Sequence, residues 1–327
     1  MGIKRLLLLM AVLVLVAVGG LAWYATRPLP IETPRTVNVL PGTHLRGLST
    51  MLEREGIVGN ADAFWLLGRV LGKGGKLKVG VYRLDRPLTP LELYAKIERG
   101  EVAQAVVQFI EGKTLRDVRQ VLAAQPLLKN DSAQLSDAEL ARAIGAEFDH
   151  AEGLLFPDTY FYAPHTSDID LLKRAYRTQQ QKLMAAWETR APGLPYRTPY
   201  EALIMASIIE KETGAAFERP QIAGVFVNRM RRGMRLQTDP TVIYGLGERF
   251  DGNLRKVDLQ RDTPYNTYTR HGLPPTPIAM PGEAAIQAAL NPAKTDALYF
   301  CARGDGTHVF SSTLEAHNRA VNRYQRR

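Results

Sequence analysis

One segment near the N-terminus carries no charge over twenty residues. Leu6–Ala25 reads LLLLMAVLVLVAVGGLAWYA and follows Lys4 and Arg5. A helix of this length spans about 30 Å, which is the thickness of the hydrocarbon core of a bilayer. Trp23 and Tyr24 lie at its far end, where aromatic side chains favour the membrane interface. The run therefore predicts a transmembrane anchor over residues 6–25.

A cleaved signal peptide is the alternative interpretation of this run. The apolar part of a signal peptide is usually shorter, and no small-x-small cleavage site precedes Arg27. No cysteine follows the run, so a lipoprotein anchor is excluded. The basic residues before the run favour a cytoplasmic tail, residues 1–5, although Arg27 and Arg35 beyond it make the asymmetry modest. We therefore expect a single-pass protein of the inner membrane whose main part lies in the periplasm.

The remaining composition indicates a globular, exported protein. Cys301 is the single cysteine, so no intrachain disulfide is possible. The net charge is +9, and +7 without Lys4 and Arg5. This excess favours lipid headgroups, cell-wall polymers or nucleic acid, and an exported location without a nucleic-acid motif argues against the last of these. A surface tuned for solubility explains the charge equally well.

The order of predicted elements indicates an α+β fold in two parts. Residues 26–36, with three prolines, read as a stiff linker. A small module follows, with strands over 36–40 and 76–84 and helices over 45–52 and 61–71. Its last helix begins after Thr89, with Glu92 completing a capping box, and ends at Gly100. A larger domain comes after it, and the strands and helices do not alternate in a βαβ rhythm.

Part of the small module is echoed 70 residues later in the chain. VNVLPGTHLRGLSTML (Val37–Leu52) aligns with VQFIEGKTLRDVRQVL (Val107–Leu122). Both segments predict a strand, a glycine turn and an amphipathic helix. A duplicated module and two independent solutions explain this equally well.

The larger domain contains an apolar helix that ends in acidic residues. Helices are expected over 169–191, over ALIMASIIEKET (Ala202–Thr213) and over 220–232, whereas 233–327 reads as mostly loops and short strands. Glu210 continues the buried stripe of the middle helix through Leu203, Ala206 and Ser207. A carboxyl group stripped of water favours its protonated form, as a general acid requires.

Glu210 has two interpretations, namely a general acid or the polar end of a core helix. Glu212 is about 200° away around the helix, on the opposite face, so both cannot point into one site. Glu212 and Lys211 are expected to be more exposed.

Two polar loops follow this helix. RLQTDPTVIY (Arg235–Tyr244) carries Gln237, Asp239 and Tyr244, and TPYNTYTRHGLPP (Thr263–Pro275) carries Tyr265 and Asn266. Amides hydrogen-bond hydroxyl and acetamido groups, and aromatic faces cover sugar C–H surfaces. The loops indicate a neutral polyhydroxylated or amide-bearing ligand, or else turns that satisfy their own backbone.

No metal site and no cofactor are expected. His271, His308 and His317 lack short metal-ligand spacing, and no cysteine pair accompanies them. The glycine-rich GRVLGKGG (Gly68–Gly75) has the wrong spacing for a phosphate-binding loop. Cys301 reads as a small buried residue.

Six segments together carry a resemblance to one family, and they are EGLLFPDTYFY, SIIEKET, VFVNRMRRGMRLQTDPTVIYG, PYNTYTRHGLPPTPIAMPG, NPAKTDALYF and HVFSSTLEAHN. In their order and in the N-terminal anchor, the chain resembles the endolytic murein transglycosylases, the YceG-like proteins. The resemblance implies that residues 37–104 are a LysM-like module, that residues 105–327 are the catalytic domain, and that Glu210 is the catalytic glutamate.

The implied reaction is the non-hydrolytic cleavage of peptidoglycan glycan strands between MurNAc and GlcNAc. Glu210 would protonate the glycosidic oxygen and then deprotonate the MurNAc 6-hydroxyl, giving a 1,6-anhydro product. Motif position suggests sugar-binding roles for Gln237, Asp239, Tyr244, Tyr265 and Asn266, and next for Glu152 and Asp158. The resemblance also implies cooperation with peptidoglycan synthases at the membrane.

Two other functions stay open on the sequence. A hydrolytic muramidase would pair Glu210 with Asp239 or Asp158, since ordinary glycosidases use two carboxyl groups. A membrane-tethered scaffold would bind the wall without cleaving it.

Overall fold

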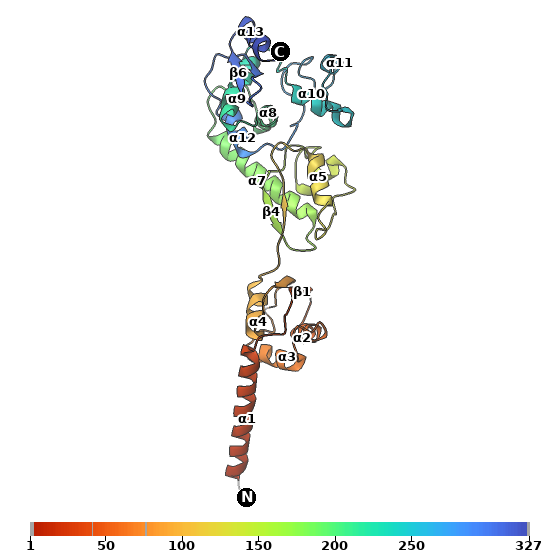
Figure 1. The fold of residues 1–327 in the computed structure, drawn as a ribbon, viewed down its shortest axis with the longest axis vertical. Helices are drawn as coiled ribbons and strands as arrows, with labels where there is room; N and C mark the ends of the chain where they lie inside the picture. The colour runs from red at the N-terminus through yellow and green to blue at the C-terminus, as the bar shows by residue number, and fades with distance from the viewer. Residues whose placement is uncertain (1–2, 41, 76, 326–327) are drawn as a thin grey trace. The chain divides into compact units, whose positions relative to one another are not determined.

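The computed structural model describes residues 3–40, 42–75 and 77–325 (Figure 1). The chain divides into two units. The first runs up to Ala105 and includes Phe161–His165, and the second comprises Val106–Tyr160 and the chain from Thr166 onward. Each unit contains its own hydrophobic core cluster. Helices and strands are both present, as the α+β prediction requires.

The apolar N-terminal run forms helix α1, Ile3–Thr26. Its side chains are exposed along nearly the whole length, and it is long and apolar enough to cross a membrane. The finding fits a single-pass anchor. The end of α1 joins the first unit, because Ala25 is buried in that unit's core and Leu21 and Tyr24 pack against it.

The first unit follows the predicted order of elements. Strands β1 (Arg35–Val39) and β2 (Gly80–Leu84) pair antiparallel. Helices α2 (Leu45–Arg54), α3 (Ala61–Val70) and α4 (Pro90–Arg99) supply apolar side chains to the same core. Phe64 of α3 stacks on Tyr94 of α4 with ring centroids 4.2 Å apart. The capping box of Thr89 and Glu92 is present, and Gly100 ends α4 with a left-handed backbone.

The segment read as a stiff linker is packed onto the first unit. Leu29 and Ile31 are buried, and the Leu29 N–H donates to the Leu88 carbonyl at 2.7 Å. Apolar side chains alternate with prolines here, and their burial in the core outweighs the tendency of prolines to extend away from it. Residues 26–36 therefore do not separate α1 from the unit.

The second unit is mainly helical. Its helices are α5 (Leu115–Ala123), α6 (Asp137–Ile144), α7 (Asp168–Glu188), α8 (Pro199–Glu212), α9 (Arg219–Arg231), α10 (Asp239–Leu246), α11 (Lys256–Gln260), α12 (Glu283–Leu290) and α13 (Leu314–Tyr324). Short 3₁₀ turns cover Ala216–Glu218 and Gly247–Arg249. Strands β5 (Tyr299–Ala302) and β6 (His308–Ser311) pair antiparallel, and β3 (Ala105–Gln108) pairs with β4 (Thr159–Tyr162).

Among residues 233–325, loops and short strands prevail, as expected, but helices that the sequence did not predict also occur there. Helices α10, α12 and α13 lie in this region. Helix α12, EAAIQAAL, begins after Gly282, which offers no side-chain cap, and packs along α8. Tertiary packing rather than a local start signal makes it helical.

Helix α8 is the centre of the second unit. Every residue of Ala202–Ile209 is buried, and α7, α9, α10 and α12 all contact the helix. Thr198 caps its start by accepting from the Glu201 N–H at 3.2 Å, and Pro199 occupies the first turn. The helix therefore places Glu210 and Glu212 at the edge of a fully packed core.

The 70-residue echo corresponds to a repeated strand–turn–helix. It is β1, Gly42 and α2 in one copy and β3, Gly112 and α5 in the other. Both glycines have positive φ, 81° and 72°, which favours glycine over other residues. In the second copy the Gly112 N–H donates to the Met280 carbonyl at 2.9 Å, which fixes this turn beside the end of α8.

Helix α9 lies so close to the segment before β5 that one added methyl group would disturb their packing. A Cβ on Gly224 would lie 2.6 Å from the Ala293 carbonyl oxygen. We expect Gly224→Ala to lower the free energy of unfolding by about 1–3 kcal/mol, because backbone must move to accommodate the methyl group. Chemical denaturation of the full chain in detergent measures this. Gly214→Ala is the control, since no atom lies within 4 Å of its added Cβ, and equal losses in the two variants would contradict the expectation.

Candidate active site

The two glutamates at the end of α8 face different surroundings, as their spacing predicts. The Glu210 side chain is only 5% exposed and forms an ion pair with Arg219 at 2.9 Å. Its other oxygen accepts from the Gly282 N–H, at the start of α12, at 3.0 Å. Burial raises the pKa of Glu210, while the Gly282 N–H and the Arg219 charge oppose that shift.

Glu210 is therefore held by donors on both carboxylate oxygens. Both donors favour the ionised form, and the nearby helix start favours it too. Glu111, from the Gly112 turn, lies 4.0 Å from the same Arg219 group. Glu210 is not among the residues that line either of the two cavities described below. The arrangement resembles a structural ion pair that ties α8 to α9 and α12.

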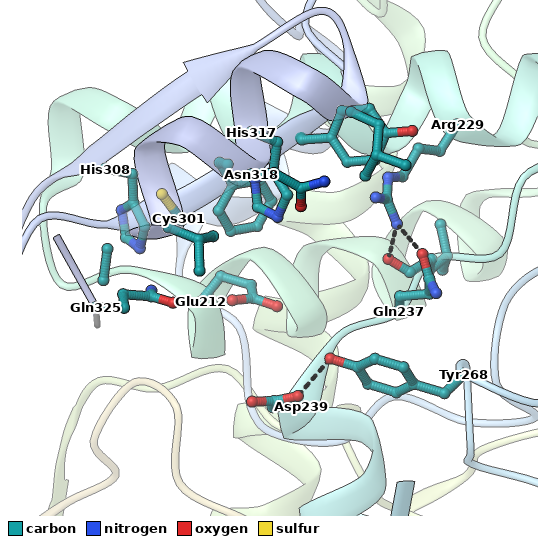
Figure 2. A pocket seen from close by; sticks show the side chains of 16 residues that line it. Glu212, Arg229, Gln237, Asp239, Tyr268, Cys301, His308, His317, Asn318 and Gln325 are labelled. Carbon is teal, nitrogen blue, oxygen red and sulfur yellow. Dashed lines mark hydrogen bonds between the residues drawn. The ribbon is translucent and has the colours of Figure 1, made fainter. Parts of the chain in front are cut away.

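Glu212 lines an open cavity of about 530 Å³ (Figure 2). Lys211 is exposed, as expected, but Glu212 is partly buried like Glu210, and its carboxylate accepts a hydrogen bond from the Thr238 hydroxyl. Burial raises the pKa of Glu212 to about 7, and the neighbouring Asp239 charge adds to that effect. A carboxyl group with this pKa, facing a cavity, is able to donate a proton near neutral pH.

The wall of this cavity contains two of the residues predicted from the polar loops. Asp239 begins α10, and its carboxylate accepts from the Tyr268 hydroxyl at 2.5 Å. Gln237 accepts through Oε1 from the Arg229 guanidinium at 3.1 Å. Tyr268 also belongs to the cavity lining (Figure 2). Glu212 thus shares its cavity with a second carboxylate, an amide and a phenol.

His308 and Glu218 form a further polar pair beside the cavity. The His308 imidazole lies 2.8 Å from the Glu218 carboxylate, whose other oxygen accepts from the His308 N–H at 2.9 Å. Glu218 is buried and lies just before α9, whereas His308 begins β6. The pair therefore fastens the β5–β6 hairpin to the start of α9.

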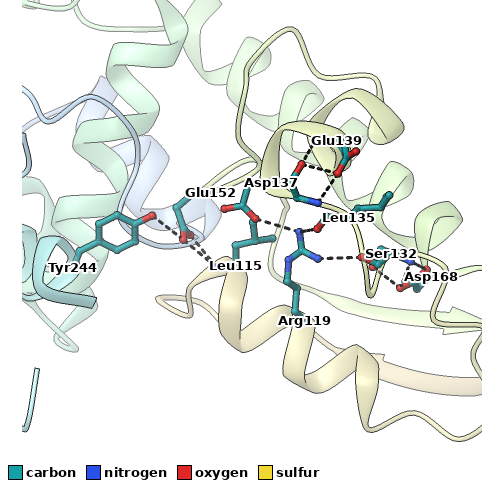
Figure 3. Close-up of polar contacts among 10 residues, drawn as sticks. Leu115, Arg119, Ser132, Leu135, Asp137, Glu139, Glu152, Asp168 and Tyr244 are labelled. Atoms are coloured by element: carbon teal, nitrogen blue, oxygen red, sulfur yellow. Dashed lines mark hydrogen bonds and ion pairs between the residues drawn. The ribbon is translucent and has the colours of Figure 1, made fainter. Parts of the chain in front are cut away.

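Three other predicted residues lie at a second cavity of about 590 Å³. Glu152 is buried there and accepts from the Leu115 N–H at 3.1 Å and from the Tyr244 hydroxyl at 3.2 Å (Figure 3). Burial raises the pKa of Glu152 to about 7. Tyr265 packs edge-on against Tyr244, with ring centroids 4.9 Å apart. Glu152 therefore links α5 to α10.

The remaining two predicted residues belong to neither cavity lining. Asn266 is buried, and its amide nitrogen donates to three backbone carbonyls between 2.7 and 3.2 Å away, those of Asp258, Leu259 and Arg261. Asp158 is exposed and accepts from the Thr159 N–H at 2.7 Å. The contacts of Asn266 fit a role in loop structure, the alternative that its sequence context left open.

The sequence did not single out Glu212 or Arg229 as site residues, and it placed Tyr268 only within the polar loop Thr263–Pro275. The face of α8 opposite Glu210 was expected to be exposed, but α7, α9, α10 and α12 surround the helix. The aromatic composition of the loop that contains Tyr268 was a signal from which this residue could have been selected. Among residues 3–40, 42–75 and 77–325, no group of three His, Cys, Asp or Glu side chains is arranged to hold a metal ion.

Comparison with known proteins agrees with this arrangement of motifs. The model of the YceG-like family matches residues 37–323. The chain belongs to the YceG-like family. The match extends from β1 to α13 and so covers both units.

Two relatives and one solved structure extend the comparison. The chain is 32% identical to an endolytic murein transglycosylase of Bacillus subtilis, over 94% of this chain and 91% of that protein. It is 28% identical to an endolytic murein transglycosylase of Streptococcus pneumoniae, over 88% of this chain and 57% of that longer protein. A crystal structure of a yceG-like protein from Listeria monocytogenes is 32% identical, with a TM-score of 0.54, and covers 88% of this chain and 99% of that one.

The raised pKa of Glu212 predicts a pH-dependent stability effect. The folded state holds its proton up to about pH 7, whereas an unfolded glutamate loses it near its ordinary value of 4.5. Ionisation of Glu212 therefore destabilises the fold progressively between these pH values. We expect Glu212→Gln to raise Tm relative to wild type by a few degrees at pH 8 and not at pH 4, since about 1 kcal/mol moves Tm by roughly 2–4 °C.

Thermal melts of the full chain in detergent at the two pH values test this expectation. Glu188→Gln removes an exposed glutamate from α7 and serves as the control. A pH-independent difference between Glu212→Gln and wild type would show that the carboxyl group is not desolvated.

Proposed function

We propose that this protein is a membrane-anchored lytic transglycosylase that cleaves peptidoglycan glycan strands between MurNAc and GlcNAc. Family membership and the activity named for the relatives support the reaction class. The observation that carries the proposal is Glu212, a carboxyl group with a pKa of about 7 that lines an open cavity with amide and phenol groups.

Glu212 is the acid that the geometry favours over Glu210. A general acid needs a free path to the leaving-group oxygen and a proton to give. Glu212 lies in the cavity lining, whereas both oxygens of Glu210 already accept from Arg219 and Gly282. Glu210 stays a prediction of the sequence resemblance, and the paired variants below separate the two.

In the proposed reaction one carboxyl group acts twice. Protonated Glu212 gives its proton to the glycosidic oxygen as the bond to the MurNAc anomeric carbon breaks. The resulting carboxylate takes the proton of the MurNAc 6-hydroxyl, whose oxygen attacks the same anomeric carbon. The products are a GlcNAc hydroxyl end and a 1,6-anhydroMurNAc end, and no water is consumed.

A hydrolytic muramidase is the second candidate, and one observation favours it. Asp239 lines the same cavity as Glu212, so two carboxyl groups are available as in ordinary glycosidases. The Tyr268 hydroxyl donates a hydrogen bond to the Asp239 carboxylate. In that reaction water would attack the anomeric carbon and leave a reducing end.

The remaining parts of the proposal concern location and binding. Helix α1 would anchor the chain in the inner membrane, with its N-terminus in the cytoplasm and both units in the periplasm. The first unit would act as a LysM-like module, and the second as the catalytic domain that meets glycan strands. Peptidoglycan synthases that make those strands are the proposed protein partners. If the wild-type protein binds peptidoglycan and does not cleave it, the protein is instead a scaffold that binds the wall.

Digestion of purified peptidoglycan by the full chain in detergent tests the acid. We expect Glu212→Gln to lower the cleavage rate by about 10²–10⁴, the usual contribution of a positioned acid. Glu210→Gln is expected to lower stability through the Arg219 pair and to keep cleavage within about tenfold of wild type. Glu188→Gln is the charge-matched control. The reverse pattern would assign the acid to Glu210.

Product masses decide between the two reactions, and a pH profile tests Glu212 as the acid in either of them. Lytic cleavage gives anhydro ends, which are 18 Da lighter than reducing ends because water is absent from the product. Reducing ends alone would show a hydrolase and overturn the transglycosylase.

We expect the rate of glycan cleavage to fall as pH rises through about 7, because Glu212 then loses the proton that it must donate.

A further inference from the structure

Gln237 holds an unusual backbone conformation in the wall of the Glu212 cavity. Its φ is +53°, a left-handed value that is unfavourable for a residue other than glycine. Its N–H donates to the Thr267 carbonyl at 3.2 Å, and its neighbour Thr238 donates a hydroxyl to Glu212. Strain of this kind is retained where the position of a side chain matters.

Arg229 fixes which way the Gln237 amide faces. A guanidinium has donors only, so the atom that faces Arg229 at 3.1 Å must be the amide oxygen. Arg229 is itself buried and donates to the carbonyls of Leu298 at 2.6 Å, Leu236 at 2.8 Å and Arg235 at 3.0 Å. A turned amide would place its N–H groups against those of Arg229, so the orientation is locked.

With its oxygen held by Arg229, the Gln237 amide has its nitrogen Nε2 available to donate to a ligand. Gln237 is an exposed residue of the cavity lining, and its side chain appears beside Arg229 in Figure 2. Within the described ranges, no hydrogen bond from Nε2 to a protein acceptor occurs. A fixed N–H donor that is free of protein partners selects a ligand atom that accepts hydrogen bonds and does not donate them.

We propose that Gln237 is a specificity-determining residue whose Nε2 donates to the acetamido carbonyl oxygen of the amino sugar bound beside Glu212. This proposal rests on the proposed glycan-cleaving function. Hydroxyl groups both donate and accept hydrogen bonds, so a donor such as Nε2 does little to distinguish one hydroxyl group from another. An acetamido oxygen only accepts, whereas the protonated amine of a de-N-acetylated sugar only donates and meets the amide N–H groups unfavourably. Gln237 thereby selects N-acetylated strands.

The test compares N-acetylated glycan strands with de-N-acetylated ones, each before and after enzymatic removal of the stem peptides. Initial cleavage rates of the full chain give kcat/KM, and binding to Glu212→Gln gives Kd without turnover. We expect wild type to prefer N-acetylated strands, and Gln237→Met to reduce that preference about fivefold, the worth of one hydrogen bond. Gln237→Glu offers only acceptors, so it is expected to shift the preference toward the free amine.

Two controls separate a specific effect of Gln237 from a general effect of the substitution on charge or folding. Gln181→Glu changes an exposed glutamine on α7 by the same chemistry and is expected to keep the wild-type preference. Thermal melts of each variant show whether it folds, and Gln237→Met preserves side-chain length if the introduced charge of Gln237→Glu disturbs Arg229.

Each outcome has a distinct meaning. An unchanged preference in folded, cleaving Gln237 variants overturns the role of Gln237 and leaves the proposed function standing. A preference seen only when stem peptides are attached assigns the acceptor to a peptide carbonyl and overturns the acetamido assignment. Absence of both binding and cleavage in wild type overturns the proposed function and this inference together.

Discussion

The burial of α8 is the constraint on which the second unit depends. The helix contacts α7, α9, α10 and α12, and its residues from Ala202 to Ile209 are shielded from water. Because the helix is enclosed in this way, the residues at its C-terminal end lie in a poorly solvated environment. The two glutamates at its end therefore both have raised pKa values, and the groups that surround each one decide what it does.

Those surroundings divide the two carboxyl groups into different chemical roles. Glu210 meets Arg219 and the start of α12, so its charge is matched within the fold. Glu212 meets a threonine hydroxyl and a second carboxylate at an open cavity, so its charge is poorly matched. The buried ion pair joins three helices, whereas an unmatched buried acid is destabilising, a pattern that is common at functional sites.

The sequence was informative wherever local signals determined structure. The apolar run at Leu6–Ala25, the capping box of Thr89 and Glu92, and the repeated strand–turn–helix all correspond to elements of the structure. It failed where distant segments decide. The partners of Glu210 and Glu212 include Gly282 and Thr238, and the distance in sequence hides which glutamate each one meets. Helix α12 was missed for the same reason, since packing on α8 stabilises it.

The end of α1 has a consequence for how the chain must assemble. Ala25 is buried in the core of the first unit, with Leu29 and Ile31 close behind it. Removal of the helix would therefore uncover apolar surface on a unit that otherwise meets water. If α1 spans a membrane as proposed, its insertion is coupled to folding of the first unit, because Leu21, Tyr24 and Ala25 at its end pack in that unit's core. A protease acting at this junction would separate Ala25 from that core and expose the apolar side chains that pack against it.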